Sequence, residues 1–269
     1  MLRSLIEALS FGFMQRALWA GGLIALTCAC LGVFLLLRRL ALIGDGLAHV
    51  AFASIALALV LHQAPMMLSV PLVAAASLLI LEISERGKVH GDAALGLVSS
   101  FAVAVGVILA SIGKGFNVDL FSYLFGSILV VTKAEVWAAG VLCAAVLSSV
   151  AVLYHDLFAL AFDEDYARAS GVRTAVVNRL LVVLSSITVV LGIKLVGTML
   201  VSSLIILPAA AAFQFAKGFG RAILWSAIFA VSSIVIGVLG SYVLNLPSGA
   251  CVVLVNFFFF LIAFLFTRF

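Results

Sequence analysis

Nine apolar runs, each close to the length that crosses a lipid bilayer, make up most of this chain of 269 residues. A helix rises about 1.5 Å per residue, so the hydrocarbon core of a bilayer, about 30 Å thick, needs about 20 apolar residues. Hydrophobic residues make up 66% of the chain and charged residues only 10%, whereas about 25% of residues in soluble proteins are charged. We therefore expect an all-α polytopic membrane protein, with a single transmembrane domain over residues 1–269.

The runs predict about nine transmembrane helices, with an error of about one. They lie near residues 12–37, 42–62, 66–83, 93–113, 134–153, 179–194, 196–216, 222–244 and 250–267. The weakest division is around Lys194, because the apolar run from Leu180 is too long for one helix and barely long enough for two. Residues 119–131 are too few to cross, and we expect a half-helix or a re-entrant segment there.

Lys and Arg residues gather on the cytoplasmic side of membrane proteins. With the N-terminus outside, the inner side holds Arg38, Arg39, Arg86, Lys88, Arg168, Arg173, Arg179, Lys217, Arg221 and Arg268. The outer side then keeps only Arg3, Arg16, Lys114, Lys133 and Lys194. This division predicts an outer N-terminus and an inner C-terminus. The net charge of +4 follows from the same bias and requires no nucleic-acid partner.

A carboxylate and an imidazole interrupt the second apolar run, at Asp45 and His49. Titratable side chains are costly in hydrocarbon, so they normally face a polar pathway and mark the transported species. Residues four apart share one face of a helix, and a carboxylate with a neutral imidazole suits a divalent first-row metal. His49 is ten residues beyond Arg39, which on a continuous helix places it about 15 Å deep. We expect a metal-ligand pair; the alternative is a buried hydrogen-bonded pair that only fixes helix packing.

The longest polar interruption, residues 154–178, falls on the inner side. Within it Asp163, Glu164 and Asp165 precede a short helical pattern that Arg168 and Gly171 close. Acid at the start, base at the end and a glycine stop are typical of a helix. A helix this short is unstable alone, so it needs a surface to dock on, either the bilayer or another cytoplasmic protein.

The sequence lacks the motifs of a self-sufficient enzyme. It contains no P-loop, so any ATP hydrolysis requires a separate subunit. It also lacks Gly-x-Ser-x-Gly and His-Glu-x-x-His, which would indicate a hydrolase or a metalloprotease. The four cysteines lie within apolar runs and are expected to be core residues. His62, His90 and His155 fall at loop edges, and their roles stay open, although His62 on the outer side could help to receive an ion.

Five stretches resemble, in order, the bacterial ABC-type zinc and manganese permeases. They are Gly32–His49, Asp119–Leu129, Phe162–Gly171, Lys194–Ala209 and Leu246–Ala250. The resemblance implies a type II ABC importer-like permease in the bacterial inner membrane that works as a homodimer. It also implies two copies of a cytoplasmic ATPase, an extracytoplasmic metal-binding protein and no permanently bound cofactor.

The same resemblance assigns roles to individual residues. It implies that Asp45 and His49 are ligands in the metal pathway. It implies that residues 163–171 form the coupling helix seated in the ATPase, with the coupling residues Asp163, Glu164, Ala167, Arg168 and Gly171. Members of this family often carry Pro-Gly a few residues after the histidine, where this chain has Ala53-Ser54. The absence of proline puts a kink at that point in doubt.

Zinc is the first expectation for the transported ion. A two-fold axis beside the second helix would bring together two aspartates and two histidines, a set that zinc accepts tetrahedrally. Manganese or iron would take similar ligands with added waters. A permease for a siderophore, haem or cobalamin is an alternative, but it would want a wide cavity and no intramembrane ligand pair. A proton-coupled secondary carrier is another, and co-purification with an ATPase would separate it from the importer.

Overall fold

The computed structural model describes residues 10–86, 91–112 and 131–267, and the regular elements in these ranges are α-helices. Nine of the described helices are long and apolar enough to cross a membrane. They are α2 (Gly12–Leu37), α3 (Ile43–Val60), α4 (Pro65–Arg86), α5 (Gly91–Ile112), α7 (Lys133–Val152), α10 (Thr174–Val196), α11 (Thr198–Phe215), α12 (Phe219–Leu244) and α13 (Ser248–Phe266). The prediction of an all-α polytopic membrane protein with about nine spans is confirmed.

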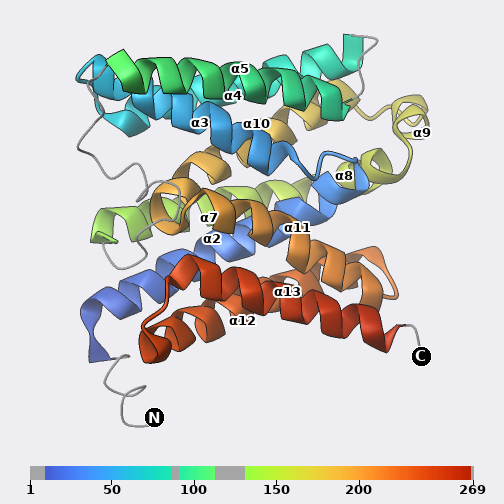
Figure 1. Ribbon diagram of the computed structural model, residues 1–269. Helices are drawn as coiled ribbons and strands as arrows, with labels where there is room; N and C mark the ends of the chain where they lie inside the picture. The colour runs from blue at the N-terminus through green and yellow to red at the C-terminus, as the bar shows by residue number, and fades with distance from the viewer. Residues whose placement is uncertain (1–9, 87–90, 113–130, 268–269) are drawn as a thin grey trace.

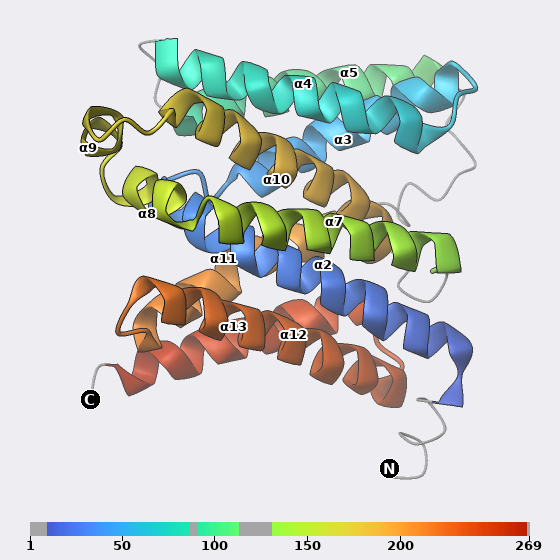
Figure 2. The ribbon, with the colours of Figure 1, turned by 180° about the vertical axis from the view of Figure 1, so that it is seen from behind.

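The spanning helices lie side by side in one bundle (Figures 1 and 2). Helices α3, α4 and α5 pack together on one side, and α12 and α13 lie on the other. Helix α2 lies between them and packs against α7, α11 and α12. In the apolar stretch of α2, 72% of the residues are buried within the chain, whereas in that of α5 only 17% are buried. Helix α2 is therefore the central support of the bundle, and α5 lies at its surface.

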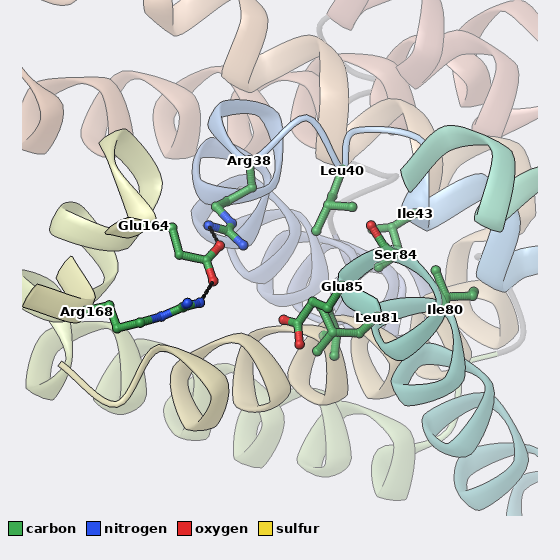
Figure 3. Close-up of a pocket in the computed structure, with 10 residues that line it drawn as sticks. Arg38, Leu40, Ile43, Ile80, Leu81, Ser84, Glu85, Glu164 and Arg168 are labelled. Carbon is green, nitrogen blue, oxygen red and sulfur yellow. Dashed lines mark hydrogen bonds and ion pairs between the residues drawn. The ribbon is translucent and has the colours of Figure 1, made fainter. Parts of the chain in front are cut away.

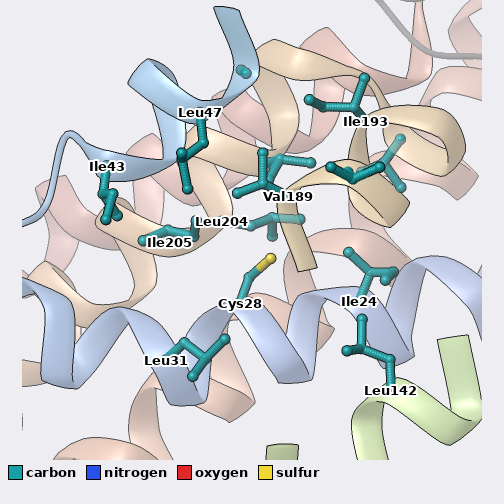
Figure 4. Packing of buried hydrophobic residues seen from close by; sticks show 14 of the residues in the cluster. Ile24, Cys28, Leu31, Ile43, Leu47, Leu142, Val189, Ile193, Leu204 and Ile205 are labelled. Atoms are coloured by element: carbon teal, nitrogen blue, oxygen red, sulfur yellow. The ribbon is translucent and has the colours of Figure 1, made fainter. Parts of the chain in front are cut away.

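Close helix packing takes the place of the hydrophobic effect inside a bilayer, and small residues make it possible. A Cβ atom at Gly32 of α2 would collide with the carbonyl oxygen of Ile205 of α11. Around this contact the apolar side chains of α2, α3, α7, α10 and α11 interdigitate (Figure 4). Cys28 lies fully buried in this cluster. Cys28, Cys30 and Cys143 are buried free thiols, which confirms their expected place in the core, whereas Cys251 is only partly buried.

Two short helices follow α7, namely α8 (Tyr154–Phe162) and α9 (Glu164–Ala169). They lie at the same end of the bundle as the C-terminus, opposite the start of α2 (Figure 1). Arg38, Arg168, Arg173 and Lys217 belong to the connections at this end. The positive-inside bias makes it the expected cytoplasmic end.

The division between the sixth and seventh spans lies at Gly197. Helix α10 ends at Val196, and Gly197 has φ of +90°, a conformation that glycine adopts without steric cost. Helix α10 begins at Thr174, earlier than the predicted start at residue 179. Its first turns carry the polar Asn178, whose side chain donates to Glu85 Oε1 of α4 at 3.1 Å. The predicted re-entrant segment, residues 119–131, falls almost entirely outside the described residues.

Candidate functional site

The two predicted metal ligands lie together on α3. His49 Nε2 is 3.8 Å from Asp45 Oδ2, which is beyond hydrogen-bonding distance. The Asp45 side chain is 62% exposed and that of His49 45% exposed in the single chain. The pair is therefore neither buried nor hydrogen-bonded internally, which does not match the alternative of a pair that only fixes helix packing. One polar stripe faces outward from a helix that is otherwise largely buried.

Glycines on both sides of Asp45 explain why the Asp45 side chain faces outward from α3. A Cβ at Gly44 would lie 2.8 Å from Ile205 Cδ1 of α11. A Cβ at Gly46 would lie 3.0 Å from the Oγ atom of Ser99 on α5. The two helices thus approach the α3 backbone closely on either side, and the Asp45 side chain is left at the open face between them.

The predicted depth of the pair assumed a helix that continues from Arg39, and that assumption is wrong. Residues 38–42 turn instead of continuing a helix, with Arg39 at φ of +58°, and α3 begins only at Ile43. His49 is therefore six residues, or about 9 Å, from the start of its helix. The pair lies toward the inner end of α3, and Asp45 is in the first turn, where the helix dipole favours a carboxylate.

One chain offers only part of a metal site. Within the described ranges there is no group of three or more His, Cys, Asp or Glu residues placed to hold an ion. His62 follows α3 at the end away from Asp45, and His155 lies on α8. His90 lies outside the described residues. In the ranges that the structure describes, Asp45 and His49 are thus not joined by a third such side chain of the same chain.

The predicted helix in residues 163–171 is present as α9. Asp163 caps its start by accepting a hydrogen bond from the Tyr166 backbone N–H at 3.0 Å. Gly171, at φ of +88°, follows its end, and the Val172 N–H donates to the Ala167 carbonyl at 3.0 Å. Ala167 is completely buried. The acid and glycine signals read from the sequence therefore correspond to real capping contacts, whereas the base, Arg168, forms an ion pair with Glu164 of the same helix.

Aromatic residues hold the preceding helix, α8, which the sequence analysis did not recognise as a separate element. Phe158 and Phe162 pack edge-on against Phe219 at the start of α12, with ring centroids 5.1 and 6.1 Å apart. Phe162 and Tyr166 are also 63% and 66% exposed. The helices α8 and α9 thus present exposed aromatic rings at the expected cytoplasmic end, and α9 also carries the exposed Arg168.

Arg38 is a further residue of this region that sequence reasoning treated only as part of the basic bias. Its Nη1 atom lies 2.8 Å from Glu164 Oε2, while Arg168 Nη2 lies 3.2 Å from Glu164 Oε1 (Figure 3). Arg38 Nη1 also donates to the Leu160 carbonyl at 3.1 Å. A cavity of about 500 Å³ adjoins these side chains. The position of Arg38 next to a helix end was the only sequence signal for this contact.

The family model for the ABC 3 transport family matches residues 10–267. The "Manganese transport system membrane protein MntC" of Listeria innocua is 31% identical over 258 residues, covering 96% of this chain and 92% of the relative. The "Probable metal transport system membrane protein" of Treponema pallidum is 37% identical over 248 residues, covering 92% and 93%. Both names concern metal transport, and the first specifies manganese, not zinc.

A solved structure, "PsaBC from Streptococcus pneumoniae in complex with Fab", matches with a TM-score of 0.87. It is 30% identical, and the match covers 98% of this chain and 95% of that chain. The sequence match and the structural match thus agree over nearly the whole length. The chain belongs to the ABC 3 transport family, as a multi-pass membrane permease of metal transport.

Proposed function

We propose that this chain is the permease subunit of an ATP-driven importer of divalent manganese, and that Asp45 and His49 bind the ion on its way. The observation that carries the proposal is the outward-facing pair on α3, with side chains 62% and 45% exposed in the single chain. A carboxylate and an imidazole facing lipid would be costly. In a polar pathway between two protein surfaces, the same two side chains could bind the ion.

A second copy of the chain is the proposed cover for this face. Two copies related by a two-fold axis along α3 would supply two carboxylates and two imidazoles. That arrangement completes the site that one chain leaves with two ligands. Gly44 and Gly46 let α11 and α5 pack close to the α3 backbone on either side of Asp45. The face that carries Asp45 and His49 would therefore stay open to the second copy.

Manganese replaces zinc as the proposed ion. Mn²⁺ takes carboxylate, imidazole and water ligands, and the exposure of Asp45 leaves room for water. The Listeria relative is named for manganese transport, as is the "Manganese import system permease protein ScaB" of Streptococcus parasanguinis, 32% identical over 265 residues. The same ligand set would also accept zinc, so the metal is chosen on the relatives as well as on chemistry.

The chain contains no nucleotide-binding P-loop, so an ATP-driven importer needs partner subunits. A cytoplasmic ABC ATPase, in two copies for a homodimer, would seat on α9, and an extracytoplasmic metal-binding protein would deliver the ion. The exposed side chains of Tyr166, Phe162 and Arg168 offer the aromatic and charged contacts that protein interfaces favour. The chain itself is proposed to be a transport subunit and not an enzyme.

Uptake by proteoliposomes that contain the permease with its ATPase and delivery protein tests the proposal. We expect uptake of radiolabelled manganese that requires internal ATP and is competed by unlabelled manganese more strongly than by zinc or iron. Preferential uptake of zinc would support the importer function but would show that zinc, not manganese, is the transported ion. Uptake of a metal chelate only, or uptake that needs a proton gradient and no ATPase, would contradict the proposed function.

A further inference from the structure

We infer that Arg38 is the link that couples α9, the proposed ATPase-docking helix, to α3, the helix that carries Asp45 and His49. The inference rests on the proposed function and adds a residue to its mechanism. It assigns Arg38 a positioning role: the guanidinium does not bind the metal, but it holds the docking helix and the metal helix in a fixed relation.

The first observation is how Arg38 is held. It follows the last residue of α2, and its side chain is only 15% exposed. Nη1 donates both to Glu164 Oε2 of α9, at 2.8 Å, and to the Leu160 carbonyl of α8, at 3.1 Å. A guanidinium that is mostly desolvated and bound to two elements holds them more firmly than a surface ion pair does.

The second observation is the cavity that lies between α9 and the start of α3. Helix α9 packs mainly on α8 and α10. A cavity of about 500 Å³ is lined by Glu164 and Arg168 on one side, and by Leu40, Ile43, Ser84 and Glu85 on the other (Figure 3). This space separates α9 from the beginning of α3 and the end of α4. The Arg38–Glu164 contact is a direct bond across its edge.

The third observation is the short, hydrogen-bonded path from Arg38 to the metal pair. The Leu40 N–H donates to the Leu35 carbonyl at 2.8 Å, and the Ile43 N–H donates to the Leu40 carbonyl at 3.0 Å. These bonds fix the turn between α2 and α3, and Asp45 lies in the next turn of helix. A displacement of α9 that pulls on Arg38 therefore reaches the inner end of the metal pathway through a stiff connection.

Arg39 provides a matched control. It is the adjacent residue in the same turn and carries the same charge, but it is exposed. In the part of the chain that the structure describes, its side chain has no ion pair or hydrogen bond. The variants Arg38→Gln and Arg39→Gln thus remove the same charge from the same side of the membrane, and they differ in the link to Glu164.

The experiment measures metal taken up per ATP hydrolysed in proteoliposomes holding the full complex, with manganese as the ion. We expect Arg38→Gln to retain ATPase binding and hydrolysis while uptake per ATP falls about tenfold, within the range of typical coupling energies. Glu164→Gln should produce the same defect, and Arg38→Lys, which keeps a charged donor, should lose less. Arg39→Gln should stay within about twofold of the unmodified protein.

The outcomes separate this inference from the proposed function. Absence of ATP-dependent uptake by the unmodified complex would contradict the proposed function itself. Normal uptake by the unmodified complex, together with equal uptake per ATP in Arg38→Gln and Arg39→Gln, would overturn the link alone. If Arg38→Gln does not assemble, Glu164→Gln is the deciding variant. The Glu164 side chain is partly exposed, so its replacement disturbs the fold less. Normal uptake per ATP in Glu164→Gln would overturn the link.

Discussion

Metal uptake should fall at least about 100-fold when either Asp45 or His49 is replaced by alanine, since even the outer partners of metal ligands cost about 10–100-fold when they are removed. Asp45 and His49 are the two donors proposed for each chain at the α3 face, and water cannot replace a charged carboxylate in a confined pathway. The side chains are exposed in the single chain, so their truncation leaves no cavity in the core. Uptake by proteoliposomes with the full complex is the measurement.

Two further variants make this result specific. Asp45→Asn keeps the size and polarity of the side chain, so its failure would show that the negative charge is needed. His155→Ala removes another histidine, on α8, and should leave most uptake intact. All variants should assemble with the ATPase as the unmodified chain does. Near-normal uptake by both alanine variants of the pair would remove the ligand assignment.

Gly171→Val should release the permease from its ATPase. Gly171 has φ of +88°, and a β-branched side chain held in that conformation costs about 1–3 kcal/mol. Helix α9 has six residues and little stability of its own, so it should shift or unwind at this cost. Because about 1.4 kcal/mol is a factor of ten in an equilibrium constant, we expect ATPase binding to weaken about tenfold or more in a quantitative pull-down.

Gly171→Asn is the control for this variant. Asparagine tolerates the left-handed conformation better than other non-glycine residues, and a Cβ at position 171 would meet no atom within 4 Å. We therefore expect this variant to retain most ATPase binding. Equal pull-down of the ATPase by the valine, asparagine and unmodified forms would show that α9 is only a connection between spans.

The spans could be predicted from the sequence because length and hydropathy decide whether a helix crosses a bilayer. The predicted run 12–37 coincides with α2, and most other limits differ by a few residues. The start of α10 differs more, because Asn178 finds a hydrogen-bond partner in Glu85 and is accepted within the helix. Hydropathy alone cannot anticipate a partner 93 residues away in the chain.

The candidate site could be predicted in part. The spacing of Asp45 and His49 correctly placed both on one face of a helix, since that follows from helical geometry alone. Their depth could not be obtained, because the turn at Arg39 interrupts the count. The contact between Arg38 and Glu164 joins residues 126 apart in the chain. It depends on how α9 folds back against the end of α2, which no local pattern records.

The central claim, that manganese binds at Asp45 and His49, is tested most directly by electron paramagnetic resonance of Mn²⁺ bound to the purified permease–ATPase complex. Mn²⁺ is paramagnetic, so a directly bound imidazole nitrogen gives a hyperfine coupling in pulsed measurements. We expect this coupling in the unmodified protein, its loss in His49→Ala and its persistence in His155→Ala. Bound Mn²⁺ without nitrogen coupling, or with coupling unchanged in His49→Ala, would contradict the account and place the ion elsewhere.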